Sequence, residues 1–273
     1  MKYICKRTPE PIKIDGDLTK PQWQKGEKSR RFIDCIGENP ALYETRAAVM
    51  WDDEALYVGF WCEEPFPNAT NTERDSLLWF ENDVEVFIDG KDSYYELELN
   101  VLNTVYEMFY VWKDAYKTNP LFDKPRFDIF DNHAISFGGN HDRTGYNFWK
   151  GTHPRGLRWA YRNWDFPGLE TAVKVDGVVN DNSVISKGWT VEIKFPWKGF
   201  EDLSTGRTGA PKAGDVWKIF FGRYEKLELN GGVTNVGWAW DPIGDDDNHY
   251  PEKFTDIILS DEVVVYKDST SDE

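Results

Sequence analysis

The carboxylates best placed for binding chemistry alternate with apolar residues in one predicted hairpin. Because successive side chains of a β-strand point to opposite faces, VEVFID (84–89) and YYELELNVLN (94–103) each predict one aliphatic and one polar face. A four-residue connection between them pairs residues whose numbers add to 183, since 89 then faces 94. This register closes a core on the aliphatic face and sets Glu85 opposite Glu98 on the outer face.

Two like charges that face each other on a sheet destabilise it by some tenths of a kcal/mol unless a partner compensates them. An arginine, a bound cation, a shared proton or the hydroxyls of a ligand would each serve. The same register sets Asp83 opposite Asn100, and Trp79 lies just before the strand, at the rim of this face. We interpret the face as a site for a polar ligand or an ion; the alternative is two carboxylates splayed into water.

Two residues from distant segments are further candidates for this face. Arg223 ends VWKIFFGRY (216–224) on the same parity as apolar residues, so it is either a sheet-edge charge or a counter-ion for the Glu85–Glu98 face. A guanidinium that bonds a carboxylate is a common way to hold a polar site, which favours the counter-ion. His249 is a candidate sugar contact, a candidate metal ligand or a surface histidine.

The elements that must position these residues are predicted to be strands. Alternating apolar residues and turn clusters recur along the chain, and the evidence for helices is thin. The predicted strands are 45–51, 55–62, 84–89, 94–103, 171–176, 189–195, 216–224 and 255–259. We therefore expect an all-β fold, an antiparallel β-sandwich.

One segment interrupts this pattern. Between residues 104 and 170 the alternation weakens, and the segment carries Trp112, Trp149, Trp159 and Trp164. Since long loops without structure are uncommon in compact domains, we expect strand extensions and a long, aromatic-rich insertion. The expected organisation is a single domain over 1–260, with this insertion, and a polar tail over 261–273.

The charge and composition of the chain argue against several classes of function. The 48 acidic residues outnumber the 32 basic ones, for a net charge of −16, which disfavours nucleic acid and anionic membranes as partners. No stretch reaches the roughly 20 apolar residues that span a bilayer. The N-terminus lacks the apolar region of a secretory signal, so we expect a cytoplasmic protein if Met1 is the native start and an extracellular one if a leader was removed. The oligomeric state stays open.

Acidic turns raise the question of a metal ion. Asp52–Glu54 and Asp245–Asp247 supply the oxygen ligands that calcium prefers, although neither has the spacing of a calcium-binding loop. Calcium is therefore expected only as a possible structural ion, and no metal-binding residues are assigned.

Several segments, taken in order, resemble the family 9 carbohydrate-binding modules that are often attached to xylanases. The matching segments are IDGDLTKPQW (14–23), TRAAVMWDDEALYVGFWCEEP (45–65), WFENDVEVFIDG (79–90) with YYELELNVLN (94–103), GWTVEIKFPW (188–197) and WDPIGDDDNHYPEKFTDIIL (240–259). The resemblance implies a jelly-roll-like antiparallel β-sandwich, no catalysis of its own and often a structural calcium ion.

The resemblance also implies roles for particular residues. Two tryptophans of the family sandwich a sugar, and Trp79 matches the first of them. Glu85 matches an acidic residue that accepts sugar hydroxyls, and Asn100 matches an amide on the return strand. Two positions depart from the pattern: Glu98 stands where a well-known member has a basic residue, and Asn248 stands where the second tryptophan is expected.

These observations predict non-catalytic binding of an oligo- or polysaccharide such as xylan, with a chain end as one candidate ligand. An aromatic platform at Trp79 and polar side chains at Glu85, Glu98, Asn100, Arg223 and His249 would form the site. The alternative is a glycoside hydrolase or other carbohydrate-active enzyme that uses Glu85 and Glu98 as its carboxylate pair, since opposed carboxylates can lie near the roughly 5–5.5 Å separation of retaining glycosidases.

Overall fold

The computed structural model describes residues 1–130, 133–139, 152–207, 210–229, 231–245 and 247–265. Trp149, Asp246 and the tail from residue 266 onwards lie outside the described residues, so expectations about them are not addressed.

The described chain forms strands that follow one hydrogen-bonded path. Their order is β10-β11-β4-β3-β1-β14-β12-β5-β6-β7-β9-β8, with β13 paired to β12 and to β2. Their bounds are β1 Lys2–Arg7, β2 Ile33–Asp34, β3 Thr45–Trp51, β4 Ala55–Glu63, β5 Asp83–Asp89, β6 Ser93–Asn100, β7 Val105–Trp112, β8 Ala134–Phe137, β9 Arg158–Tyr161, β10 Glu170–Asp176, β11 Gly188–Pro196, β12 Val216–Leu229, β13 Gly232–Ala239 and β14 Thr255–Val263.

Helices are short and lie outside the sheet. They are α1 Pro21–Lys25 and the single-turn or slightly longer 3₁₀ segments η1 Leu78–Phe80, η2 Ala115–Lys117, η3 Pro120–Phe122, η4 Pro125–Phe127, η6 Trp197–Leu203 and η7 Pro251–Lys253. None of the described helices is long and apolar enough to cross a membrane.

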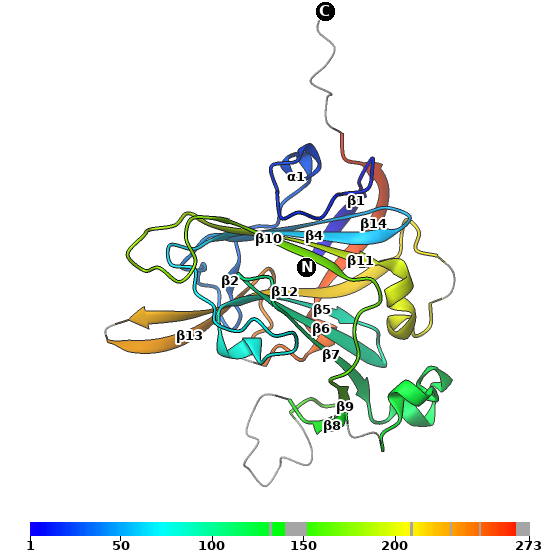
Figure 1. Ribbon diagram of the computed structural model, residues 1–273. Helices are drawn as coiled ribbons and strands as arrows, with labels where there is room; N and C mark the ends of the chain where they lie inside the picture. The colour runs from blue at the N-terminus through cyan, green and yellow to red at the C-terminus, as the bar shows by residue number, and fades with distance from the viewer. Residues whose placement is uncertain (131–132, 140–151, 208–209, 230, 246, 266–273) are drawn as a thin grey trace, which may run out of the picture.

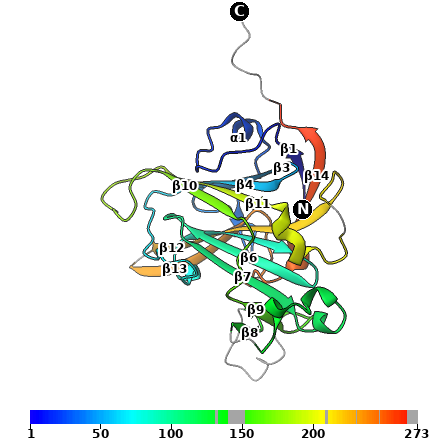
Figure 2. The same ribbon diagram turned by 45° about the vertical axis from the view of Figure 1, so that its right-hand side comes forward.

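The sheet folds over into two stacked layers, which confirms the predicted β-sandwich. One layer contains β10, β11, β4 and β3, and the other contains β12, β5, β6 and β7 (Figure 1). The apolar faces of both layers meet in one core, in which the ring centroids of Phe60 of β4 and Phe221 of β12 lie 6.2 Å apart. Figure 2 shows α1 on the outer side of the first layer and β8 and β9 at the far end of the second.

The predicted hairpin register is confirmed. β5 and β6 pair Asp83 with Asn100, Val84 with Leu99 and Glu85 with Glu98, and the two residue numbers of each pair add to 183. The aliphatic residues of this hairpin are buried in the core between the layers, as alternation requires. The carboxylates therefore lie on the other face of the second layer.

Two features of the sheet differ from the expectation of a purely antiparallel sandwich with a separate insertion. β1 pairs in parallel with both β14 and β3, because the N-terminal strand fills the space between the two layers' edges. The beginning of the expected insertion is also part of the sheet: β7 pairs with β6 along nearly its whole length, and β9 and β8 extend the sheet beyond β7.

A buried carboxylate fixes the N-terminal segment that resembles the family pattern. Glu192 of β11 is fully buried and accepts hydrogen bonds from the backbone N–H groups of Asp15 (2.8 Å) and Gly16 (2.7 Å) and from the indole of Trp23 (2.6 Å). The Lys20 ammonium completes the set at 2.5 Å. The motif around residues 14–23 thus anchors the chain end on the first layer.

Candidate functional site

The outer face of the second layer carries a cluster of carboxylates that is buried rather than exposed. Asp83, Glu85 and Glu98 are 0%, 4% and 1% exposed, and Glu96 is 5% exposed. The alternative in which Glu85 and Glu98 splay into water is therefore wrong. The sheet alternation located these side chains on the correct face but could not reveal what covers that face.

The cover is the connection between β13 and β14. Asn248, in this connection, donates its side-chain N–H to Glu85 over 2.6 Å. His249 is 3% exposed and places its Nδ1 3.1 Å from the Tyr94 hydroxyl. The fully buried Arg158 of β9 donates to the backbone carbonyl of His249 over 2.6 Å, so a distant strand holds this connection in place.

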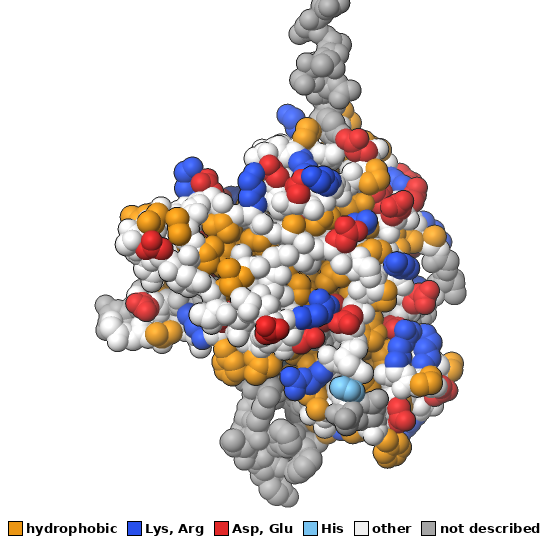
Figure 3. Space-filling model, in the orientation of Figure 1, with side chains coloured by type: hydrophobic (Ala, Val, Ile, Leu, Met, Phe, Trp, Pro, Cys, Tyr) orange, Lys and Arg blue, Asp and Glu red, His pale blue; other side chains and the backbone are white. Residues whose placement is uncertain are grey.

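Between the cover and the sheet lies a cavity of about 550 Å³. Its carboxylate wall includes Glu85 and Glu98, and its aromatic lining includes Trp79, Tyr106 and Phe137. Trp79 is 43% exposed and meets Tyr106 edge-on, with ring centroids 5.1 Å apart. Hydrophobic side chains gather on the surface around η1, which carries Trp79 (Figure 3). The cavity therefore has an acidic wall and an aromatic rim.

The carboxylates of this face strengthen one another's preference for the neutral form. Burial raises the pKa of the Asp83, Glu85 and Glu98 carboxyls well above their ordinary values, and repulsion from neighbouring carboxylates, Glu96 in each case, raises them further. Glu98 also shares a hydrogen bond with Glu96, which requires a proton on one of the two. The hydrogen bond from Asn248 opposes the increase at Glu85.

Arg223 is not the counter-ion of this face. It pairs with Val84 in the register between β12 and β5, so its side chain points to the opposite face from Glu85. Its guanidinium is fully buried and bonds Glu64 at 2.6 Å and Glu225 at 2.9 Å. The expectation that Arg223 offsets the Glu85–Glu98 pair is therefore wrong, because strand parity sends it away from them.

Asn100 faces the same side as Glu98, but its amide holds a turn. Its Oδ1 accepts the backbone N–H groups of Leu102 and Thr104, both at 3.0 Å. Its Nδ2 donates to the Asn71 carbonyl at 2.9 Å and to Glu81 at 3.3 Å. Asn100 is not among the residues that line the cavity.

Several lining residues were not among the candidates from the sequence. Glu96, Tyr106 and Tyr110 follow the outward parity of β6 and β7, so extending the alternation to a third strand would have found them. The Tyr110 hydroxyl donates to Glu96. No tryptophan of the 104–170 segment within the described residues lines the cavity; tyrosines and Phe137 supply its aromatic groups instead.

The acidic turns proposed as calcium sites have other partners. Asp52 accepts the backbone N–H groups of Glu54 and Ala55, at 2.8 and 2.9 Å, and thereby closes the β3–β4 turn. In the second turn, Asp247 accepts the N–H of His249 at 3.1 Å. Across the described parts of the chain, the three acidic side chains that come together in a metal-like arrangement are Asp83, Glu85 and Glu98.

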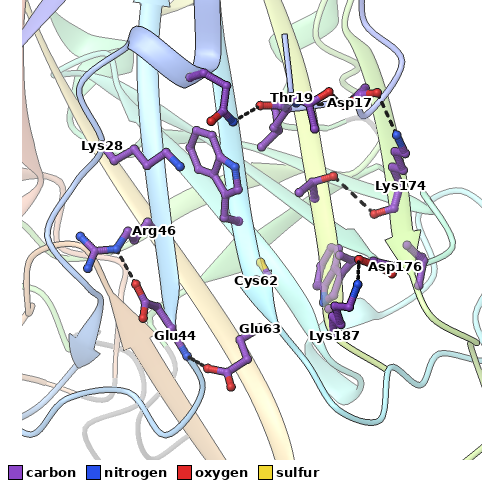
Figure 4. A pocket seen from close by; sticks show the side chains of 17 residues that line it. Asp17, Thr19, Lys28, Glu44, Arg46, Cys62, Glu63, Lys174, Asp176 and Lys187 are labelled. Atoms are coloured by element: carbon purple, nitrogen blue, oxygen red, sulfur yellow. Dashed lines mark hydrogen bonds and ion pairs between the residues drawn. The ribbon is translucent and has the colours of Figure 1, made fainter. Parts of the chain in front are cut away.

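A second, larger cavity of about 980 Å³ lies on the first layer, over β3, β4, β11 and β10 (Figure 4). Most of its charged groups are already paired within the protein: Lys174 with Asp17 at 2.8 Å, Lys187 with Asp176 at 3.0 Å and Arg46 with Glu44 at 2.7 Å. Trp61 and the buried Trp189 are the aromatic residues that line this cavity, and the Lys28 ammonium lies 4.0 Å from the Trp61 ring centroid. These paired charges leave fewer groups for a ligand than the acidic cavity does.

Comparisons with known proteins identify the fold. No protein-family model and no curated protein matches the chain. Among solved structures, a family 9 carbohydrate-binding module from Caldicellulosiruptor kristjanssonii in complex with cellotriose matches with a TM-score of 0.52 and 15% identity, over 99% of this chain and 98% of that chain. Its complex with glucose matches with a TM-score of 0.52 and 15% identity, over 97% and 100%.

A proposed carbohydrate-binding protein from Bacteroides uniformis matches with a TM-score of 0.55 and 12% identity, over 95% of this chain and 99% of that chain. The chain therefore has the fold of the family 9 carbohydrate-binding modules. At these identities the likeness establishes the fold alone, and the ligand must be argued from the site.

Proposed function

We propose that this protein binds a carbohydrate, without catalysis, in the cavity on the outer face of β5 and β6. Trp79 and Tyr106 would contact the apolar face of a sugar ring, and Glu85 and Glu98 would accept its hydroxyl hydrogens. Asn248 and His249 would close the site from above.

One observation carries this proposal: a cavity with a carboxylate wall and a half-exposed tryptophan at its mouth. Its volume, about 550 Å³, lies within the roughly 300–1,000 Å³ typical of small-molecule sites. Sugar rings present apolar C–H faces and polar edges, so they match a surface that joins an aromatic rim to hydrogen-bonding side chains. The fold's solved relatives with cellotriose and glucose support the same class of ligand.

A chain end fits the enclosure better than an internal unit does. The side chains of Asn248 and His249 are buried against the sheet at one side of the cavity, while Trp79 remains accessible at the other. A sugar residue that enters past Trp79 would therefore meet a closed wall. We propose that a terminal sugar or a free monosaccharide is bound, and that longer chains extend outward over Trp79.

The hydrolase alternative has less support from the electrostatics. A retaining glycosidase needs one ionised carboxylate as nucleophile and one protonated acid, which requires environments that push two pKa values apart. Burial raises the pKa of both Glu85 and Glu98 in the same direction. A hydrolase would release reducing ends from a bound glycan, and Glu85→Gln would abolish that release.

A glycan array on the full chain tests the proposal. The wild-type protein is applied with calcium and, in parallel, with EDTA, so that dependence on an ion does not conceal binding. We expect retention on a restricted set of neutral glycans that share a terminal sugar. Absence of retention on every glycan under both conditions would overturn carbohydrate binding.

A further inference from the structure

Three carboxylates on the outer face of β5 and β6, two of which line the cavity, have the geometry of ligands around a single ion. One oxygen each of Asp83, Glu85 and Glu98 lie within 4.8 Å of one another. Asp83 and Glu85 are two residues apart on β5, and Glu98 faces Glu85 from β6, so the rigid centre of the sheet sets this spacing. Ligands on opposite sides of an ion at about 2.4 Å from each oxygen would be about 4.8 Å apart, within the range for calcium.

Buried oxygens of this cluster lack partners among the described residues. Both carboxylate oxygens of Asp83 and Oε2 of Glu98 are buried and make no hydrogen bond there. The backbone of Tyr224 lowers the pKa of the Asp83 carboxyl, but neither carboxylate oxygen of Asp83 has a hydrogen-bond partner among the described residues. An unsatisfied buried acceptor costs about 1–3 kcal/mol, and more when it is charged, so three such oxygens in one place require an explanation.

Among the described residues, no ion pair joins a cationic side chain to Asp83, Glu85 or Glu98. Arg162 lines the cavity, but its side chain is exposed to solvent. Arg223, the buried arginine of the adjacent strand, is committed to Glu64 and Glu225 on the other face. Lys226 lines the cavity, but its ammonium donates to the carbonyl of Phe80 at the rim. The three carboxylates therefore lie together without an ion pair to a cationic side chain of the described residues.

We propose that Asp83, Glu85 and Glu98 bind a divalent cation of the calcium type where Glu85 and Glu98 border the cavity. All three donors are hard carboxylate oxygens, which suit calcium and not the softer metals that favour histidine or cysteine. Magnesium demands a near-ideal octahedral shell at about 2.0–2.1 Å and gives up its water reluctantly, whereas calcium accepts the flexible geometry of several protein carboxylates.

The position of the cation gives it a role in the proposed function, on which this step rests. Glu85 and Glu98 both line the cavity, so coordination positions that the protein does not fill would face the ligand. Water would occupy them in the free protein, and two neighbouring hydroxyls of a sugar would replace that water. A single ammonium group of an amino sugar would offset less of the charge of three carboxylates than a divalent ion does, which favours the metal.

Calorimetric titration of calcium chloride into the chelator-treated full chain, without sugar, tests the cation site. We expect one equivalent to bind to the wild-type protein, with an increase in melting temperature. The isosteric variants Asp83→Asn and Glu98→Gln should each weaken binding at least about 10-fold. Asp53→Asn serves as the matched control, because Asp53 is an exposed acid in the β3–β4 turn.

Three results would overturn the cation site: no heat and no change in melting temperature with calcium, equal affinity in the two cluster variants, or loss of affinity in the control. A second arm repeats sugar binding in EDTA. Retained binding of a neutral sugar would remove the cation from ligand contact and leave the proposed function intact. Binding of glucosamine in EDTA, without binding of calcium, would replace the metal with an ammonium group.

Discussion

At the scale of single residues, the acidic wall of the cavity is the feature that most distinguishes this protein from a site in which two tryptophans sandwich a sugar. Asn248 stands where the resemblance leads one to expect a second tryptophan, and it bonds Glu85 over 2.6 Å. One side of the site is thus polar and the other aromatic. Recognition should therefore depend on hydroxyl positions as well as on ring stacking.

Replacement of Glu85 by Gln should weaken sugar binding about 10-fold. The amide keeps the volume of the side chain but loses the charged acceptor, and a hydrogen bond to a charged group contributes about 1.5–3 kcal/mol. Calorimetry with the best glycan from the array measures the change. Glu63→Gln, in the cavity of the first layer, is the matched control, and an equal loss in that variant would contradict a specific role for Glu85.

The buried carboxyls also predict how stability depends on pH when no cation is present. Their pKa values are raised in the folded protein, so the folded state holds more protons than the unfolded state above about pH 4.5. The free energy of unfolding should therefore decrease as pH rises through the window above 4.5. Urea denaturation in EDTA at pH 5 and pH 8 measures this decrease. A Glu98→Gln variant with the same decrease as wild type would exclude Glu98 as a cause.

At the scale of elements, alternation in the sequence was enough to predict the hairpin that forms the carboxylate wall of the cavity. The register between β5 and β6 follows from parity and connection length alone. β13 was missed because its glycines and polar residues weaken the alternation, and β7 because its outward face is as apolar as its inward one.

The cover over the carboxylates could not be predicted in this way. It is an irregular connection whose position depends on contacts between residues far apart in the sequence, such as Arg158 with the carbonyl of His249. Arg223 illustrates a different limit of sequence analysis. The sequence shows that Arg223 points to the same face of its strand as Phe221, but it does not show how that strand pairs with the hairpin. Its partners Glu64 and Glu225 appear only once β12 is paired with β5.

The anchor of the N-terminal segment should be a major contribution to stability. Glu192→Gln removes a buried charge that bonds Lys20, two backbone N–H groups and Trp23, so it should cost about 2–4 kcal/mol in the free energy of unfolding. Urea denaturation gives the value. Glu170→Gln, which breaks the more exposed pair with Lys194, should leave the midpoint nearly unchanged. A midpoint for Glu192→Gln equal to that of wild type would refute the anchor.

At the scale of the whole molecule, the two layers of the sandwich present two different cavities. The first layer carries a wide cavity in which most charges are paired with one another (Figure 4). The second layer carries the smaller acidic cavity beneath the β13–β14 connection. The fold of the family 9 modules thus supplies the scaffold, while the side chains of the second layer define the candidate site.

The net charge of −16 predicts which glycans are accepted. Affinity for a neutral glycan should change less than about 2-fold between low and high salt, because no long-range charge attraction contributes. A uronic-acid polymer should bind more weakly and gain affinity as salt screens the repulsion. Titrations at low and high sodium chloride, with calcium held constant, measure both. Tighter binding of the acidic polymer at low salt would contradict this account.

The most direct test of the central claim compares two tryptophans, one in each cavity. Calorimetry with the best glycan from the array gives the affinity of the wild type, of Trp79→Ala and of Trp61→Ala, after circular dichroism has confirmed that each variant is folded. We predict a loss of about 10-fold or more, or about 1.4 kcal/mol, for Trp79→Ala and wild-type affinity for Trp61→Ala. Wild-type affinity in Trp79→Ala together with a loss in Trp61→Ala would place the sugar in the other cavity and contradict the account.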